Sequence, residues 1–298
     1  MPIPETQLET WSHQPAPGPS RDTYAAVKKT LEDGAAPFAT KGPKIYLQGS
    51  YGNDTNVARD SDVDVVCFIT GTFASDAAYL GEEQYAKFQL EYPGTASYSY
   101  SQYKADVTAW LQKQYGNGVR AGNKAIYIPA GVNRRECDVL PAIEYRYYYR
   151  FNSSVDQSYA QGICFYLPDG TQVVNFPKQH LDNCTTKHQA TDSWFKRTVR
   201  VYKNMRNYMI DRRMLDEGIA PSYFIEGMLY NVPNAQFGVN FNSTFVETFN
   251  YLVNADRSQW RCANGILPLY GNTQTSWSVA NCQTYLDAMR TLWNKWPI

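Results

Sequence analysis

Two aspartates separated by a single residue are the first side chains in this sequence whose types and spacing could do chemistry. Asp62 and Asp64 lie in DVDVVCFIT, a run rich in β-branched residues that predicts a strand over residues 62–70. Because positions i and i+2 of a strand share a face, the two carboxylates project together while Val63 and Val65 face the core. At about 6 Å and an effective dielectric near 20, the carboxylates repel by roughly 2–3 kcal/mol. The pair therefore predicts a bound cation that offsets this repulsion.

A Gly-Ser pair upstream strengthens this interpretation, because a lone Asp-x-Asp more often marks the solvent side of an edge strand. Gly49 and Ser50 follow a short predicted strand at 44–47, and an 11-residue connection separates them from Asp62. Gly49 lets the backbone approach a phosphate closely, while Ser50 offers a hydroxyl and an amide from the start of a predicted helix. We expect this pair, with Gln48 before it, to cradle a triphosphate that faces the metal-binding carboxylates.

A third carboxylate is expected from a later strand, and the segment RECDVLPA supplies Asp138. Glu136 lies two residues earlier and would share its face, so it is the local competitor of Asp138. Three carboxylates can hold two metal ions about 3.5–4 Å apart, and carboxylate oxygens suit Mg²⁺, with Mn²⁺ as a substitute. One of the two ions would activate a 3′-hydroxyl for attack on a phosphate of the bound triphosphate. We assign Asp138 to that ion, with Asp62 and Asp64 bridging both ions.

The elements that must position these residues follow from hydrophobic periodicity and turn residues. A Pro-Asp-Gly turn at 168–170 predicts a hairpin, preceded by strand character over 124–149. The predicted helices cover residues 21–33, most of 76–115, 191–213, 221–231, 243–254 and 279–294. This order predicts an α+β fold with an N-terminal core at 1–184 and a helical lobe at 185–298, and a cleft between them in which ligands bind.

Composition excludes several classes of protein. Lys+Arg and Asp+Glu both number 28, so the formal charge is zero and strong binding to duplex DNA is not expected. The sequence has no run of about 20 apolar residues and no signal peptide at its start, so we expect a cytoplasmic protein without membrane contact. Six scattered cysteines predict reduced thiols. Only three histidines are present, which argues against a zinc site, and we assign no role to His13, His180 or His188.

The motif GSYGNDTNVARDSDVDVV, with Asp138 downstream, resembles the polymerase-β-type nucleotidyltransferase superfamily. More narrowly, the chain is similar to the CD-NTases, bacterial relatives of cyclic GMP-AMP synthase and oligoadenylate synthase. Further segments resemble clade E of that family, namely PIPETQLETWSHQ, VVNFPKQH, WFKRTVRVYKNMRNYMI and APSYFIEGMLYNVP. The resemblance implies a polymerase-β-like core, a mixed sheet with flanking helices, joined to a helical C-terminal lobe with the active site in the cleft.

The resemblance also implies an activity. CD-NTases join nucleoside triphosphates without a template into cyclic nucleotides that activate a downstream effector in bacterial anti-phage (CBASS) signalling. We expect a monomeric enzyme that makes a pyrimidine-containing product such as cyclic di-UMP or cyclic UMP-AMP from UTP, with ATP or CTP as a possible second substrate. The alternative is a nucleotidyltransferase that modifies a small-molecule, RNA or protein acceptor. An inert scaffold is disfavoured because the triad of Asp62, Asp64 and Asp138 is intact.

By resemblance, Asn175 lies in the donor-base pocket and selects uracil. One amide can donate to a uracil carbonyl and accept from its N3–H, although an Asn at the end of a hairpin strand can also be merely structural. Lys203 is expected to contact the donor triphosphate. Lys196 and Arg200 lie near the same helix face at spacings of 4 and 3, where a solvated basic face is the alternative.

The segment APSYFIE supplies two further candidates. By resemblance, Ser222 binds a terminal phosphate and Tyr223 stacks on the base. Ser222 could instead be only the N-cap of a helix, because serine is among the preferred N-cap residues.

Overall fold

The computed structural model describes residues 2–15, 18–58, 63–94, 96–132 and 134–297. Asp62 lies outside these ranges. The chain forms two compact units: one combines Met1–Ala16, Gly49–Ser61 and Lys178–Ile298, and the other combines Pro17–Gln48 and Asp62–Pro177. The helical unit thus includes two segments from the first 61 residues, and the predicted division at 184 remains a prediction.

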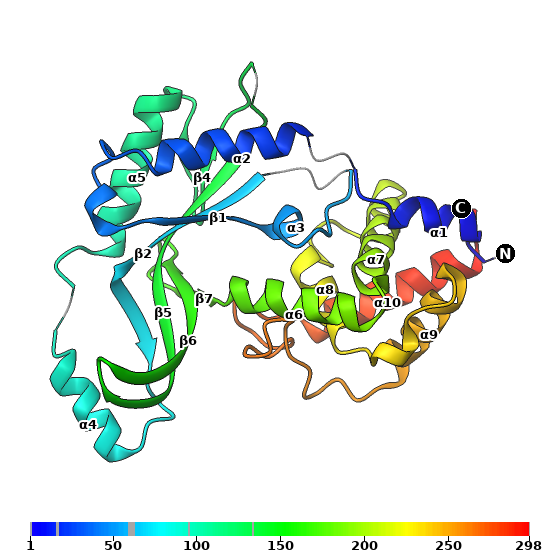
Figure 1. Cartoon of the computed structure of the whole chain (residues 1–298). Helices are drawn as coiled ribbons and strands as arrows, with labels where there is room; N and C mark the ends of the chain where they lie inside the picture. The colour runs from blue at the N-terminus through cyan, green and yellow to red at the C-terminus, as the bar shows by residue number, and fades with distance from the viewer. Residues whose placement is uncertain (1, 16–17, 59–62, 95, 133, 298) are drawn as a thin grey trace. The chain divides into compact units, whose positions relative to one another are not determined.

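The second unit is built on a seven-stranded mixed sheet (Figure 1). Its strands are β1 (Lys44–Gln48), β2 (Val63–Asp76), β3 (Arg120–Ala121), β4 (Ile126–Ile128), β5 (Cys137–Ser153), β6 (Asp156–Tyr166) and β7 (Gln172–Asn175). The order runs β1-β2-β5-β4-β3, while β6 pairs with β5 and β7. Strands β2 and β5 are parallel, and the other pairs are antiparallel.

The two faces of this sheet differ in what covers them. Helix α2 (Gly18–Leu31) packs on β1 and β2, and helix α5 (Tyr100–Tyr115) packs on β5 (Figure 1). Val63 and Val65 are fully buried, which confirms that they face the core, and nearby the Cys67 thiol lies 3.0 Å from the Tyr103 hydroxyl of α5. Because side chains alternate along β2, Asp64 lies on the opposite face.

A small apolar cluster and one further helix complete this unit. On the face that carries Asp64, a core cluster joins Val66, Phe68, Ala142 and Ile163. Helix α4 (Glu82–Glu91) packs on the far part of β5, where Gln84 accepts a hydrogen bond of 2.8 Å from the backbone N–H of Phe151.

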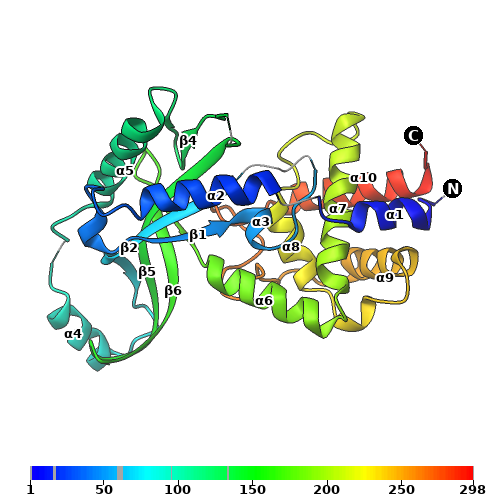
Figure 2. The same ribbon diagram turned by 45° about the horizontal axis from the view of Figure 1, so that its top comes forward.

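The first unit is helical. Its elements are α1 (Glu5–Ser12), α3 (Gly49–Gly52), α6 (Pro177–Ala190), α7 (Trp194–Asp211), α8 (Ser222–Tyr230), α9 (Phe241–Asn254) and α10 (Val279–Asn294). Helix α7 is central and contacts α1, α8, α9 and α10 (Figure 2). Its buried residues include Tyr202, whose backbone carbonyl accepts a hydrogen bond of 2.9 Å from the Tyr285 hydroxyl of α10.

The predicted strands, the hairpin and the predicted helices are found, but two α-helices, α1 and α6, were not expected. Helix α1 is short, and α6 has a polar sequence whose buried positions are His180, Cys184 and Lys187. These three lie at helical spacing, yet two of the three side chains are polar, so hydrophobic periodicity did not reveal the helix. All six cysteines are free, as predicted.

Within the parts of the chain that the structure describes, no helix combines the length and the apolar character needed to cross a membrane.

Candidate active site

A row of four side chains crosses the sheet of the second unit. Asp64 of β2 pairs with Gln48 of β1 on one side and with Asp138 of β5 on the other, and Asp138 pairs with Tyr127 of β4. Residues that pair directly across neighbouring strands share a face, and the strands lie about 4.8 Å apart. The register therefore brings the two predicted carboxylates side by side on the face opposite α2 and α5.

The pKa of Cys137 is sensitive to the two neighbouring carboxylates, Asp64 and Asp138. Burial raises the pKa of this thiol to about 12, and the negative charges of Asp138 and Asp64 contribute to the rise. Glu136 lies outside β5, is exposed, and raises the pKa of Tyr127 through a side-chain hydrogen bond. The register thus selects Asp138 rather than Glu136 as the neighbour of Asp64.

The donor chemistry of this row fits a hard divalent cation. Asp64 and Asp138 are half-buried carboxylates, and the buried side-chain oxygen of Gln48 has no hydrogen-bond partner among the described residues. Oxygen donors of this kind suit Mg²⁺ or Mn²⁺. The predicted third ligand, Asp62, lies outside the described residues and directly precedes Val63 at the start of β2.

The Gly-Ser pair lies in a tight turn at the start of α3, where the sequence predicts that a helix begins. Gly49 has a φ of 70°, a region that disfavours residues with a Cβ, and α3 begins at this residue. Two backbone hydrogen bonds close the turn: the N–H of Asn53 donates to the carbonyl of Gly49 over 3.1 Å, and the N–H of Thr55 donates to that of Ser50 over 2.9 Å. Whether Gly49 and Ser50 bind a triphosphate stays a prediction.

The basic residues of α7 hold the segment that follows this turn. Lys196 pairs with the Asp54 carboxylate at 3.2 Å, and Arg200 donates to the Asp54 carbonyl over 2.6 Å. Lys203, which is fully buried, donates to the Thr55 carbonyl over 2.9 Å. Since Lys196 and Arg200 are also buried, the alternative of a solvated basic face is wrong. The contact of Lys203 with a triphosphate stays a prediction.

These cations lower the pKa of a neighbouring histidine. His188 accepts a hydrogen bond of 3.2 Å from the backbone N–H of Lys196 through its Nδ1 atom. Burial first, and then the positive charges of Lys196, Arg200 and Arg197, lower the pKa of His188 to about 4. The ring is therefore neutral in the folded protein at pH 5–6, where it would be largely protonated in the unfolded chain.

We expect this shift to make the protein less stable in acid. The unfolded chain binds a proton on His188 below pH 6.5, so the stabilisation is complete above that pH and is lost as the pH falls toward 4. His188→Gln keeps an acceptor for the Lys196 amide but cannot titrate. The fall in melting temperature between pH 7 and pH 4.5, measured by calorimetry, should be roughly 2–4 °C smaller in the variant. Equal falls in both proteins would contradict this assignment.

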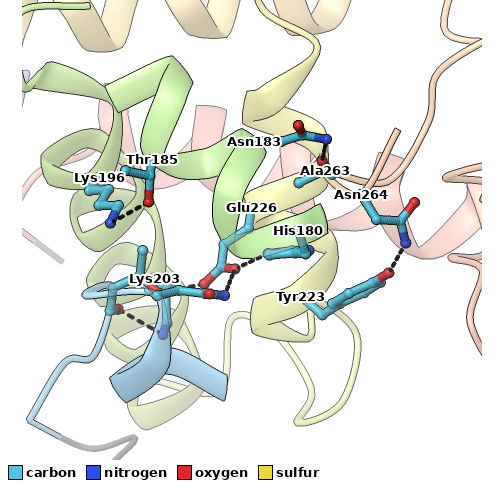
Figure 3. Close-up of polar contacts among 11 residues, drawn as sticks. His180, Asn183, Thr185, Lys196, Lys203, Tyr223, Glu226, Ala263 and Asn264 are labelled. Atoms are coloured by element: carbon cyan, nitrogen blue, oxygen red, sulfur yellow. Dashed lines mark hydrogen bonds and ion pairs between the residues drawn. The ribbon is translucent and has the colours of Figure 1, made fainter. Parts of the chain in front are cut away.

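Helix α8 carries the two candidates of the APSYFIE segment. The helix begins at Ser222 with Pro221 as its N-cap, so the N-cap alternative for Ser222 is not what the structure shows. The Ser222 hydroxyl accepts a hydrogen bond of 3.0 Å from Arg206. The Tyr223 hydroxyl accepts one of 3.0 Å from Asn264, and its ring stacks on His180 at 5.0 Å between centroids (Figure 3). The binding roles of Ser222 and Tyr223 stay predictions.

His180 and Glu226 form a buried pair that the sequence did not reveal. The His180 Nε2 atom lies 2.6 Å from a Glu226 carboxylate oxygen, and both residues are about 2% exposed (Figure 3). Burial opposes a charged imidazole, but contacts with Cys184 and Glu226 raise the pKa of His180 to about 10. Burial also opposes a charged carboxylate, yet His180 lowers the pKa of Glu226. The pair is therefore ionic at neutral pH.

Cys184 lies beside this pair, and one ligand atom from each of the three residues lies within 4.8 Å of the others. Two ligands of one tetrahedral zinc ion would be about 3.3 Å apart. The 2.6 Å between His180 and Glu226 is instead the length of a charge-assisted hydrogen bond. The trio thus has the geometry of an ion pair with a neighbouring thiol.

Asn175 ends β7 and pairs with Ile163 of β6. Its side-chain oxygen accepts a hydrogen bond of 2.8 Å from the backbone N–H of Phe176. Gly162 allows this end of β7 to lie close, because a Cβ there would be 2.7 Å from the Asn175 carbonyl oxygen. The role of Asn175 in choosing a base stays a prediction.

The chain is similar to known proteins along nearly its whole length. Residues 182–294 match the model of the cGAS/DncV-like nucleotidyltransferase C-terminal helical domain. A cyclic UMP-AMP synthase from Rhodothermus marinus is 39% identical over 99% of both chains. The solved structure of that organism's c-UMP-AMP synthase, with Apcpp and Upnpp, has a TM-score of 0.88 at 37% identity and covers 100% of this chain and 98% of its own.

Two further relatives differ in their products. A cyclic dipyrimidine nucleotide synthase from Legionella pneumophila is 33% identical over 84% of this chain and 83% of its own length. A cyclic dipurine nucleotide synthase from Elizabethkingia meningoseptica is 31% identical over 99% of this chain and 98% of its own. Relatives at similar identity therefore join different bases, so overall similarity does not decide which bases this chain uses.

Proposed function

This chain belongs to the cGAS/DncV-like nucleotidyltransferase (CD-NTase) family and is a nucleotidyltransferase, and we propose that it makes a cyclic dinucleotide containing at least one pyrimidine. The observation that carries the proposal is the pairing of Asp64 with Asp138 across parallel strands. The proposed substrates are UTP, alone or with ATP or CTP. The pyrimidine in the product is supported by the Rhodothermus relative, a cyclic UMP-AMP synthase, and by Asn175 in this sequence.

The proposed reaction is attack of a ribose hydroxyl on the α-phosphorus of a second nucleotide, with release of pyrophosphate. Two Mg²⁺ ions, held by Asp64 and Asp138 together with Asp62, would lower the pKa of the hydroxyl and neutralise the leaving group. Gly49 and Ser50 donate hydrogen bonds to the triphosphate from the start of α3. A second transfer of the same kind closes the ring, for which the nucleotides must lie in opposite orientations.

Tyr223 is the proposed stacking surface for a base, and Ser222 and Lys203 the proposed phosphate contacts. Asn175 is the proposed reader of the uracil edge, since one amide can pair with a carbonyl and an N3–H together. The product would act as a signal for a downstream effector in anti-phage defence, in the cytoplasm, and the enzyme would work as a monomer. The signalling role, the cytoplasmic location and the monomeric state rest on the resemblance of the sequence to clade E.

The proposal is tested by incubating the purified protein with Mg²⁺ or Mn²⁺ and each labelled triphosphate, singly and in pairs. The products are treated with phosphatase and identified by mass spectrometry. We expect a phosphatase-resistant cyclic dinucleotide that requires UTP. If neither metal gives a resistant product, the proposal fails. If label is transferred only to an added small molecule, RNA or protein, the alternative acceptor reaction is supported instead.

A further inference from the structure

We propose that Glu226, held in place by His180, is the positioning residue that fixes the Gly49–Ser50 turn and, through it, the place of the substrate triphosphate. The role of the turn in binding the triphosphate rests on the proposed function. The contacts that fix the turn stand independently of it. They lie within the helical unit, which includes both the segment 49–61 and helix α8.

The two residues that close the turn, Asn53 and Thr55, both bind Glu226. Thr55 donates from its backbone to the carbonyl of Ser50 over 2.9 Å and from its hydroxyl to one Glu226 oxygen over 2.5 Å. Asn53 donates from its backbone to the carbonyl of Gly49 over 3.1 Å and from its amide to the other Glu226 oxygen over 2.9 Å. A single carboxylate thus anchors both halves of the turn.

Burial makes this anchor rigid. Thr55 is fully buried, and both Glu226 and His180 are 2% exposed, so water cannot readily replace a lost partner. An unpartnered buried donor costs more than the hydrogen bond contributes when it is made, and bonds to a charged acceptor are the stronger class. The Gly49–Ser50 turn is therefore held in one position before any ligand binds, which reduces the entropy lost on binding.

His180 extends the anchor toward the proposed base-binding surface. One nitrogen of its ring bonds to Glu226 while the ring stacks on Tyr223, with 23° between the two planes (Figure 3). The same ion pair therefore fixes the Gly49–Ser50 turn and supports one face of Tyr223. This arrangement links the predicted phosphate contacts to the predicted base contact through two buried side chains.

The test compares Thr55→Val, which keeps the shape of the side chain but removes the hydroxyl donor, with Thr55→Ser, which keeps the donor. Thr248→Val is the matched control, since Thr248 is fully buried in the same unit and bonds to Tyr202 at 2.9 Å, away from the turn. KM and kcat for the triphosphates are measured by pyrophosphate release. We expect Thr55→Val and Glu226→Gln to raise KM about tenfold with a smaller change in kcat, and Thr55→Ser and Thr248→Val to keep KM within about twofold.

Hydrogen exchange at residues 53–55, measured without nucleotide, gives a second result that does not depend on turnover. We expect about tenfold faster exchange in Thr55→Val and Glu226→Gln, and no change in this segment in Thr248→Val. If Thr55→Val has the same KM and the same exchange rates as the wild type, the proposal is overturned. It is also overturned if Thr248→Val changes KM and exchange at residues 53–55 as much as Thr55→Val does. A wild type that releases pyrophosphate but forms no cyclic product contradicts the proposed product alone and leaves this comparison valid.

Discussion

Replacing Asp64 with asparagine is expected to lower kcat for nucleotidyl transfer by about a thousandfold or more while the chain remains folded. Asparagine keeps the size of the side chain but loses the negative charge that the proposed metal ligand would supply. Asp138→Asn should cause a loss of the same order, because the two residues pair directly across parallel strands. Pyrophosphate release under saturating Mg²⁺ and triphosphate measures both effects.

Glu136→Gln is the matched control for these variants. Glu136 lies one residue before β5, is exposed, and interacts with Tyr127, so neutralising it should change kcat by less than about threefold. A large loss in Glu136→Gln with activity retained in Asp138→Asn would show that the third carboxylate is misassigned. Retained activity in Asp64→Asn would contradict the carboxylate row as the catalytic centre.

Although Asp64→Asn should lower activity, we expect it to leave the stability of the fold unchanged or to increase it. In the absence of metal, neighbouring carboxylates repel each other, and a neutral amide removes that repulsion. The free energy of unfolding of Asp64→Asn, measured in urea with chelator present, should therefore equal or exceed that of the wild type. A fold that is lost in this variant would mean that the kinetic result reports unfolding rather than chemistry.

Asn175→Ser is expected to lower the preference for UTP over ATP, expressed as the ratio of kcat/KM values, by about ten- to a hundredfold. The amide can donate and accept in the plane of a uracil edge, whereas a serine hydroxyl is shorter and offers one donor. We expect kcat/KM for UTP to decrease and kcat/KM for ATP to stay the same, because adenine does not present the same hydrogen-bonding edge as uracil. Incorporation from an equimolar mixture of UTP and ATP, resolved by mass spectrometry, gives the ratio.

A suitable control for this variant is Asn152→Ser. Asn152 is an exposed asparagine of the same sheet that donates to Asp156 over 2.8 Å, and its replacement should leave the ratio unchanged. If the ratio is unchanged in Asn175→Ser as well, Asn175 plays no part in base selection. The relatives that join different bases at 31–39% identity make this comparison informative.

The local part of the site could be predicted from sequence because it depends on short-range rules. Alternation along a strand places Asp64 opposite Val63 and Val65, and the Gly-Ser pair predicts the helix that begins at Gly49. The register between β2 and β5 could not be read in this way. Asp64 and its partner Asp138 are 74 residues apart in the sequence, and only the parallel pairing of the two strands distinguishes Asp138 from Glu136.

The buried His180–Glu226 pair and its contact with Thr55 were missed for a different physical reason. His180 is 46 residues from Glu226 and Thr55 is 171 residues from it, and no periodic pattern links side chains at such separations. Helix α6, which carries His180, buries His180, Cys184 and Lys187, so its inward face contains polar side chains. Patterns of hydrophobicity reveal helices that bury apolar faces, and they do not reveal one whose buried face holds ionic contacts.

The most direct test of the whole account is the mass spectrum of the phosphatase-treated products of the wild type and of Asp64→Asn, each supplied with UTP, ATP and Mg²⁺. The account predicts a cyclic dinucleotide that contains UMP from the wild type and none from the variant. A wild type without a cyclic product, or the same cyclic product at the same rate from Asp64→Asn, would contradict it.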